Sequence, residues 1–288
     1  MPHFIEIAIG TVTMRPYVFA FFAAYLLAAV THLGWRKTLW FTLIGYGIAF
    51  LSEYSSISTG FPYGWYHYID ATRGRELWVA GIPFFDSLSY VFLTYCSFGT
   101  ALLVLGPVKA WRGNLVVLET AALRRSLSVL VLAALLQTYL DIIIDPVALQ
   151  GGRWFLGQIY GYREAGVHYG VPLTNYGGWF LTSLVLVRTL QIIDRRVGRN
   201  CGEPQGMHII PYRALFAPFL YLSVLVFNLG VTIWIGESLM ATTGIFTVLL
   251  PLVMVVILLV RRVNRFSRDE LAEHLQDFPH SPAGSRRG

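Results

Sequence analysis

Two carboxylic acids lie inside long apolar segments of this chain. Glu53 follows Lys37 by 16 residues, and Asp141 follows Arg125 by the same 16 residues. At about 1.5 Å per helical residue, both acids would lie roughly 24 Å across an apolar layer about 30 Å thick. An ionisable group at that depth is costly and marks a functional site by default. We therefore expect two acids at one depth, on two helices, to belong to one site.

The composition is that of an integral membrane protein, with 55% hydrophobic and only 13% charged residues. Soluble domains carry about 25% charged residues. Seven segments are long and apolar enough to span a bilayer, so the predicted fold class is an all-α polytopic membrane helix bundle. The predicted spans are Tyr17–Leu33, Thr38–Ile57, Ile82–Leu105, Leu127–Asp145, Gly177–Ile193, Leu215–Ile235 and Thr243–Val260.

The basic residues cluster in alternate loops between these segments. By the positive-inside rule such loops face the cytoplasm, which predicts an outer N-terminus and an inner C-terminus in a multi-pass protein of the cell membrane. The net charge of +6 therefore reflects topology, and we expect no nucleic-acid partner. The clusters are Arg36 and Lys37; Lys109, Arg112, Arg124 and Arg125; Arg195, Arg196, Arg199 and Arg213; and Arg261, Arg262, Arg265 and Arg268.

The chain divides into one transmembrane domain, residues 1–263, and a polar cytoplasmic tail, residues 264–288. In the tail, Ser267 and Glu270 fit a capping box that opens a short helix. The end from Pro279 to Gly288 is rich in Pro, Gly, Ser and Arg, and its composition predicts disorder.

The chain also contains a possible internal repeat of the second and third helices in the fourth and fifth. The segment 81–86 resembles the segment 170–175 at an offset of 89, and Tyr90 and Trp179 share that offset. Glu53 and Asp141 share an offset of 88. Parallel repeats of this kind occur in transporters, although any hairpin re-entering a membrane favours Gly, Pro and a polar cap. Either origin predicts that Glu53, Asp86, Asp141 and Asn175 lie on the outer side of four helices.

The fourth segment carries a polar stripe. Gln137, Asp141 and Asp145 are spaced i, i+4 and i+8, which places them on one helical face. Pro146 disfavours continuation of the helix, so Asp145 is expected at the outer interface. For Asp145 the alternative role is to cap a turn before Pro146.

Glu53 precedes an outer loop rich in glycine and aromatic residues. Its alternative role is an ion pair with a loop arginine, Arg73 or Arg75. The aromatics of this loop and the next exceed what interfacial anchoring requires, so some can line a hydrophobic mouth. Histidines His67 and His168 have no spacing typical of a metal site, and the sequence predicts neither a metal nor a cofactor.

These patterns resemble the membrane carotenoid-biosynthesis protein family, whose best-understood members are the carotenoid hydratases. The resemblance spans roughly residues 38–195, and His168 stands where a second tyrosine is expected. It is carried by Glu53 with Gly60-Phe61-Pro62-Tyr63-Gly64 and Tyr68; by Asp141, Asp145-Pro146 and Trp154; and by Tyr169-Gly170-Val171-Pro172, Asn175 and Gly178-Trp179.

The resemblance implies a cofactor-independent hydro-lyase that adds water to the terminal double bond of an acyclic or monocyclic carotenoid dissolved in the bilayer. Such hydration needs a proton donor, shelter for a tertiary carbocation and one placed water; a carboxyl group in an apolar site can stay protonated near neutral pH. We expect Asp141 as general acid with Glu53 or Asp145 as its partner, or the reverse assignment. Expected substrate-binding residues are Tyr63, Trp65, Asp86, Trp154, Tyr169, Asn175 and Trp179.

Three other functions stay open at this point. A lycopene-type cyclase, or another enzyme of isoprenoid lipids, shares the protonation step and ends without water. A transporter is expected to thread polar groups from face to face, whereas the inner halves of the second and fourth segments are apolar. A pigment-binding protein needs no buried acids. Other membrane enzymes of the carotenoid pathway are possible partners.

Overall fold

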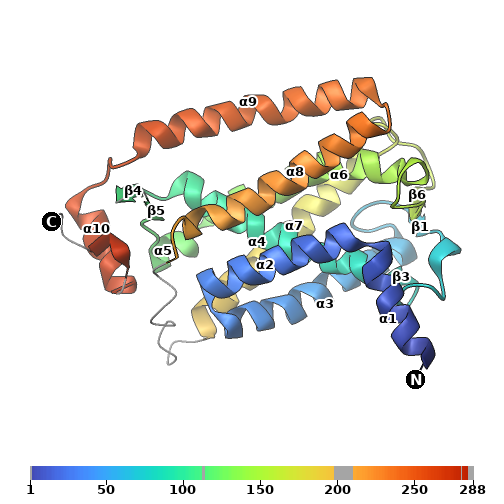
Figure 1. Cartoon of the computed structure of the whole chain (residues 1–288), viewed down its shortest axis with the longest axis horizontal. Coiled ribbons are helices and arrows are strands. Elements are labelled where there is room, and N and C mark those ends of the chain that lie inside the picture. The colour runs from blue at the N-terminus through green and yellow to red at the C-terminus, as the bar shows by residue number, and fades with distance from the viewer. Residues whose placement is uncertain (1, 112–113, 198–209, 280, 285–288) are drawn as a thin grey trace.

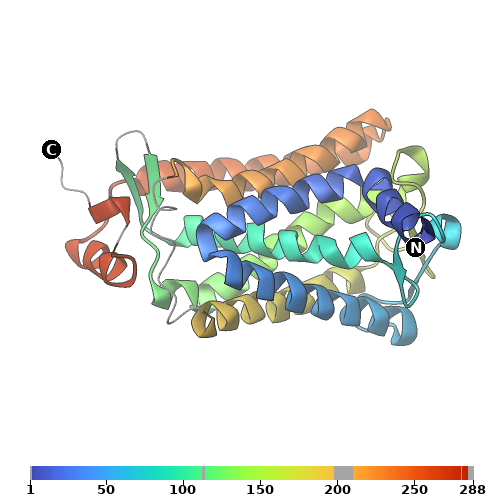
Figure 2. The same ribbon diagram turned by 60° about the horizontal axis from the view of Figure 1, so that its bottom comes forward.

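The computed structural model describes residues 2–111, 114–197, 210–279 and 281–284. Seven long helices run along the long axis of the molecule, and each coincides with one predicted span (Figures 1 and 2). The predicted all-α helix bundle is therefore confirmed. The helices are α2 (Pro16–Leu33), α3 (Trp35–Thr59), α4 (Phe84–Leu105), α6 (Leu127–Leu149), α7 (Leu173–Arg196), α8 (Phe216–Trp234) and α9 (Ser238–Arg262).

Six of these helices are long and apolar enough to cross a membrane. The seventh, α3, has 25 residues but is less apolar, because Glu53 and several serines lie in its last two turns. It packs against α2, α4 and α7. Its length and its place in the bundle are those of a spanning helix, and we treat it as one. Orientation in the membrane and common ancestry of the repeat stay predictions.

The centre of the bundle is a ring of four helices. Going round it, α3 contacts α4, α4 contacts α6, α6 contacts α7, and α7 returns to α3. The ring thus consists of the two hairpins of the predicted repeat. Outside it, α2 and α8 cover α4, while α9 packs mainly on α8 and leaves most of its surface exposed. The buried core lies inside the ring and under α2 and α8.

Both hairpins return through the same motif. Pro83 precedes α4 and Pro172 precedes α7, each in an extended conformation at the N-cap. Proline disfavours a helical conformation in the residue before it, so the helix does not extend toward the N-terminus past the proline. As a result α4 begins two residues later than predicted and α7 four residues earlier. Asp86 and Asn175 are both the third residue of their helices.

The predicted end of α6 was wrong as well, because the helix does not end before Pro146 but continues to Leu149. Neighbouring groups support the extra turn. Val147 is fully buried, and the indole Nε1 of Trp154 donates to the Val147 carbonyl oxygen at 3.0 Å. Proline is tolerated inside membrane helices when neighbours satisfy the freed backbone groups. Asp145 is consequently buried instead of capping a turn at the interface.

Short elements cover the predicted outer end of the ring, at the right of Figure 1. The central one is a two-stranded sheet in which β1 (Tyr66–Tyr68) pairs antiparallel with β6 (Tyr160–Tyr162). Each strand follows the first helix of one hairpin, so the sheet joins the two hairpins. Around it lie α1 (Pro2–Met14), η1 (Asp70–Thr72), β2 (Trp78–Val79), β3 (Ile82–Pro83) and η2 (Gly151–Arg153).

The opposite end carries a β-hairpin and the tail. Ser267 and Glu270 form the predicted capping box of α10 (Arg268–Asp277). The tail differs from the predicted disorder, because Ser281 and Ala283 are buried and Lys109 Nζ donates to the Ala283 carbonyl at 2.5 Å. Residues 280 and 285–288 lie outside the described residues. The elements here are β4 (Val108–Trp111), β5 (Asn114–Val117), α5 (Ala121–Arg124), η4 (Arg213–Leu215), α10 and η5 (Pro282–Gly284).

Candidate active site

A small polar pocket lies at the predicted outer end of the four-helix ring, beneath the β1–β6 sheet. Its volume is about 50 Å³, enough for water, which needs about 10–15 Å³ by this measure. All four ring helices and both strands contribute to it. The lining residues are Glu53, Tyr63, Tyr66, Tyr68, Asp86, Tyr90, Asp145, Tyr160, Tyr162, Asn175 and Trp179.

Three carboxyl groups face this pocket, those of Glu53, Asp86 and Asp145, and Asp141 lies directly behind it. Within the described part of the chain, none of these four forms an ion pair. The alternative pairing of Glu53 with a loop arginine is excluded, because Arg73 pairs with Asp70 and Arg75 donates to the Ala71 carbonyl. Acids of three ring helices therefore line one pocket, whereas Asp141, which was expected to meet Glu53, bonds Asn175 and does not line it.

The amide of Asn175 ties two of the acids together. Its Nδ2 donates to Asp141 Oδ2 at 2.7 Å and to Asp145 Oδ2 at 3.1 Å. Asp145 also accepts hydrogen bonds from the hydroxyls of Tyr160 and Tyr162, the latter at 2.7 Å. Asp145 thus accepts hydrogen bonds from three donors.

The other hairpin repeats this arrangement with different partners. Ser87 donates to Glu53 Oε2, and Tyr68 donates to Asp86 Oδ2 at 2.7 Å. Glu53 and Ser87 are 34 residues apart, as are Asp141 and Asn175. In each hairpin, therefore, the acid of the first helix bonds a polar side chain in the first turns of the second.

The β1–β6 sheet supplies four tyrosines because side chains alternate along a strand. Tyr66 pairs with Tyr162, and Tyr68 pairs with Tyr160. Burial first, and then the nearby carboxyl groups, raise the pKa of Tyr160 and Tyr162 well above the ordinary value of tyrosine. These hydroxyls therefore stay protonated at any physiological pH and act as hydrogen-bond donors.

Aromatic rings form the wall of the pocket on the side of α4 and α7. The rings of Tyr90 and Trp179 are stacked, with centroids 4.2 Å apart and planes 3° apart. Tyr63 lies beside them, and its hydroxyl lies 2.8 Å from Ser52 Oγ and donates to Thr182 Oγ1 at 3.0 Å. The two stacked residues occupy equivalent positions of the two hairpins.

Three residues predicted to contact substrate lie outside the pocket. Trp65 is 42% exposed at the surface, with the Arg163 guanidinium 4.1 Å from the centre of its indole ring. The indole N–H bond to Val147 turns Trp154 toward Tyr17 on α2. Tyr169 reaches α9, where its hydroxyl lies 2.8 Å from Thr243 Oγ1.

Sequence reasoning did not assign several lining residues of the pocket to the site: Tyr66, Tyr68, Tyr90, Tyr160 and Tyr162. The two Tyr-x-Tyr segments were a usable signal, since alternation places both tyrosines of each segment on one face. The buried pair of Arg15 and Glu76, 3.0 Å apart between Nη2 and Oε1, was missed as well. It joins the start of α2 to the outer loop.

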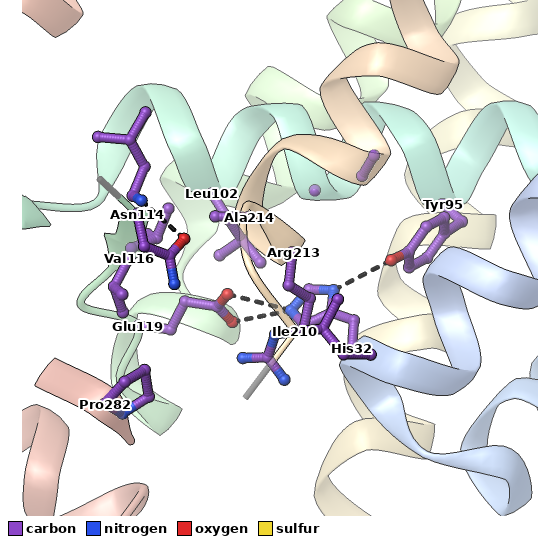
Figure 3. A pocket seen from close by; sticks show the side chains of 14 residues that line it. His32, Tyr95, Leu102, Asn114, Val116, Glu119, Ile210, Arg213, Ala214 and Pro282 are labelled. Atoms are coloured by element: carbon purple, nitrogen blue, oxygen red, sulfur yellow. Dashed lines mark hydrogen bonds and ion pairs between the residues drawn. The ribbon is translucent and has the colours of Figure 1, made fainter. Parts of the chain in front are cut away.

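A second polar pocket lies at the opposite end of the bundle (Figure 3). In it His32 Nε2 lies 3.0 Å from both carboxylate oxygens of Glu119, and His32 Nδ1 lies 3.3 Å from the Tyr95 hydroxyl. Arg124 links Glu119, at 3.6 Å, to Asp194, at 3.2 Å. This cluster connects α2, α5 and α7, and we assign it a structural role.

Replacing Glu119 by Gln is expected to destabilise the protein by about 3 kcal/mol, since it removes the carboxylate that accepts from His32 and faces Arg124 in a buried cluster. Although burial acts in the opposite direction, His32, Arg124 and Arg213 hold the pKa of Glu119 well below its ordinary value. This stabilisation is complete above the pKa of an unfolded glutamate and is lost as the pH falls toward the folded value.

Thermal unfolding of the purified variant measures the effect of Glu119→Gln. The matched control is Glu273→Gln on the exposed surface of α10, which is expected to unfold at the wild-type temperature. Equal unfolding temperatures for the two variants would show that the cluster does not stabilise this end of the bundle.

Comparison with known proteins assigns the chain to a family. A sequence model of carotenoid biosynthesis proteins matches residues 12–251, most of the chain. The chain belongs to the carotenoid biosynthesis protein family. Bisanhydrobacterioruberin hydratase of Haloarcula japonica is 32% identical over 146 residues, which are 51% of this chain and 41% of that relative. The chain thus aligns with about two fifths of the length of that hydratase. No solved structure matches it.

Proposed function

We propose that this carotenoid biosynthesis protein is a carotenoid hydratase, which adds water to the terminal double bond of an acyclic or monocyclic carotenoid. The observation that carries the proposal is the water-sized pocket lined by Glu53, Asp86 and Asp145 without an ion pair. The family and the name of the Haloarcula japonica relative support it. The substrate is too apolar to leave a bilayer, which agrees with a site enclosed by helices of a multi-pass protein of the cell membrane.

The positions of the acids favour the reverse assignment, with Glu53 as the proton donor, and they favour Asp145 over Asp141 as its partner. Glu53 faces the pocket and accepts fewer hydrogen bonds than Asp145 in the described structure, so it is the better candidate for the protonated donor. Asp145 faces the same pocket with three hydrogen-bond donors, which suits an anionic base. Asp141 lies behind Asn175 and does not line the pocket. We therefore assign Glu53 as general acid, Asp145 as general base and Asp141 as the residue that positions Asn175.

The proposed reaction balances without an oxidant or reductant. The Glu53 proton moves to the CH carbon of the terminal double bond, which leaves a tertiary carbocation. A water molecule held by Asp145 then forms the new C–O bond, and Asp145 accepts its proton. Water in the pocket returns that proton to Glu53. No metal or cofactor takes part in this scheme.

The aromatic wall has a role at the cationic stage. The faces of Tyr90 and Trp179 carry negative potential, and an aromatic face stabilises a nearby cation by roughly 0.5–2 kcal/mol. The tertiary carbocation next to this wall is sheltered from bulk water until the placed water attacks. Since the pocket has a volume of only about 50 Å³, the entry of a chain end requires side chains around it to move.

Expression in a host that accumulates lycopene tests the function. We expect pigments heavier by one or two water molecules, detected by mass spectrometry of the extracted carotenoids. A pigment of unchanged mass but altered absorption would indicate ring closure and would contradict hydration. Unchanged pigment, from a host in which the protein is inserted in the membrane, would instead favour transport or pigment binding. Any association with other enzymes of the pathway is testable by co-purification from the same membranes.

A further inference from the structure

Gln137 is a deeply buried polar residue that the proposed mechanism does not use. It lies on α6, one turn inward of Asp141, and its side chain is fully buried. Its Oε1 lies 2.9 Å from Thr94 Oγ1. Its Nε2 has no hydrogen-bond partner among the described residues. An amide nitrogen buried without a partner costs about 1–3 kcal/mol, so it calls for an explanation.

Turning the amide over does not remove the problem. Thr94 has one hydroxyl hydrogen and lies 2.7 Å from the Tyr90 carbonyl oxygen, four residues back in α4. If that carbonyl takes the hydrogen, Gln137 must donate to Thr94 through its nitrogen, and its oxygen then faces the interior. In both orientations one polar atom of the amide satisfies Thr94 and the other lacks a protein partner.

Two further polar atoms lie close to this level of the bundle. In the described structure, Asn175 donates to Oδ2 of Asp141. The other carboxyl oxygen of Asp141, Oδ1, receives no hydrogen bond from the described part of the protein. On the adjacent helix α7, Ser183 Oγ is fully buried and lacks a partner among the described residues. Along the helix axes, Asn175 is level with Asp141 and Asp145, which it bonds. Ser183 lies about 12 Å inward of Asn175. Gln137 lies about 6 Å inward of Asp141 and about 12 Å inward of Asp145.

We propose that Gln137, Asp141 and Ser183 form a binding site for one buried water molecule between α6 and α7. Side chains four residues apart on a helix have Cβ atoms about 5–6 Å apart. Two hydrogen bonds of about 2.8 Å in series span the same distance. A water molecule with two to four polar partners is a normal component of a protein interior. The water molecule would give hydrogen-bond partners to Gln137 Nε2, Asp141 Oδ1 and Ser183 Oγ.

The catalytic consequence rests on the proposed hydratase function. The water fixes the Asp141 carboxyl from the inner side, while Asn175 holds it from the outer side. Because the same amide holds Asp145, the water supports the orientation of the proposed base. Gln137 is thus a positioning residue, and a small displacement of a reacting group can lower a rate by about 100-fold.

The test compares full-length Gln137→Leu with the control Thr138→Val. Thr138 is the next residue of α6, and its hydroxyl bonds the Ala134 carbonyl of its own helix. Experimental maps that resolve ordered waters are expected to show density between Gln137 and Asp141 in wild type and in Thr138→Val, but not in Gln137→Leu. We expect kcat to fall by about 10-fold or more in Gln137→Leu, with KM and thermal stability maintained, whereas a merely structural role would lower stability.

Other outcomes are equally decisive. A wild-type map that shows other buried waters but none here, or a direct Gln137–Asp141 bond, would refute the site. If Gln137→Leu fails to insert, Ser183→Ala replaces it, and the water density is then expected to weaken; density unchanged from wild type would count against the site. A wild-type protein that binds this water but makes no hydrated product refutes the hydratase function and leaves the water site standing.

Discussion

Replacing Glu53 by Gln is expected to lower the rate of carotenoid hydration by a factor of about 100 or more, the usual contribution of a general acid. The amide keeps the size of the side chain and can still accept the hydrogen bond from Ser87, but it cannot deliver a proton. The protein should therefore insert and fold as wild type. The measurement is the initial rate of hydrated product with purified protein in lipid vesicles, next to thermal unfolding of the same samples.

Two further variants make this experiment specific. Glu164→Gln changes an exposed acid at the same end of the molecule and should leave the rate unchanged. Asp141→Asn should have a smaller effect than Glu53→Gln, because Asp141 acts through Asn175. The reverse order, with loss of activity only in Asp141→Asn, would restore Asp141 as the general acid and would contradict the assignment drawn from the pocket.

Adding one methyl group at Gly178 is expected to destabilise the protein by about 1–3 kcal/mol and to displace α7 from the site. A Cβ atom there would lie 2.6 Å from the Pro62 carbonyl oxygen and 2.6 Å from the Tyr63 ring. The backbone oxygen cannot move away without shifting the loop that places Tyr63 in the pocket. Gly178→Ala should therefore lose both thermal stability and hydration activity.

The neighbouring glycine provides the matched control. A Cβ atom at Gly177 would meet nothing within 4 Å, and alanine stabilises a helix relative to glycine by up to about 1 kcal/mol. Gly177→Ala is therefore expected to unfold at the wild-type temperature or slightly above it, with full activity. Equal behaviour of the two variants would show that the close contact between α7 and the 61–63 turn does not support the site.

The helices were predictable because each spans an apolar layer, and length with hydrophobicity suffices to find such segments. That Glu53 and Asp141 lie toward the same end of the ring was predictable for a related reason, since each acid lies at the same distance from a basic loop residue. The different roles that we propose for them, and thus the division between acid and positioning residue, could not be predicted. It depends on Asn175 standing between Asp141 and the pocket, a contact set by how α6 packs on α7.

The β1–β6 sheet shows the same limit. Each strand has three residues, and Tyr68 and Tyr160, which pair with each other, are 92 residues apart in the sequence. Nothing local indicates that pairing, so these four tyrosines were counted among loop aromatics of which some can line a hydrophobic mouth, and none was assigned to the site. The continuation of α6 through Pro146 was missed for a comparable reason, because the contacts that support it come from Trp154 and from the tyrosines of β6.

The most direct measurement of the central claim is hydration by the purified full-length protein in vesicles containing an acyclic carotenoid, with water labelled by deuterium and by a heavy oxygen isotope. If buried carboxyl groups protonate the terminal alkene and water traps the cation, each hydrated end must carry one deuterium on carbon and one heavy oxygen in the new hydroxyl group. A product that carries deuterium on carbon but no new hydroxyl group would contradict the account. A new hydroxyl group without the heavy oxygen isotope would contradict it as well.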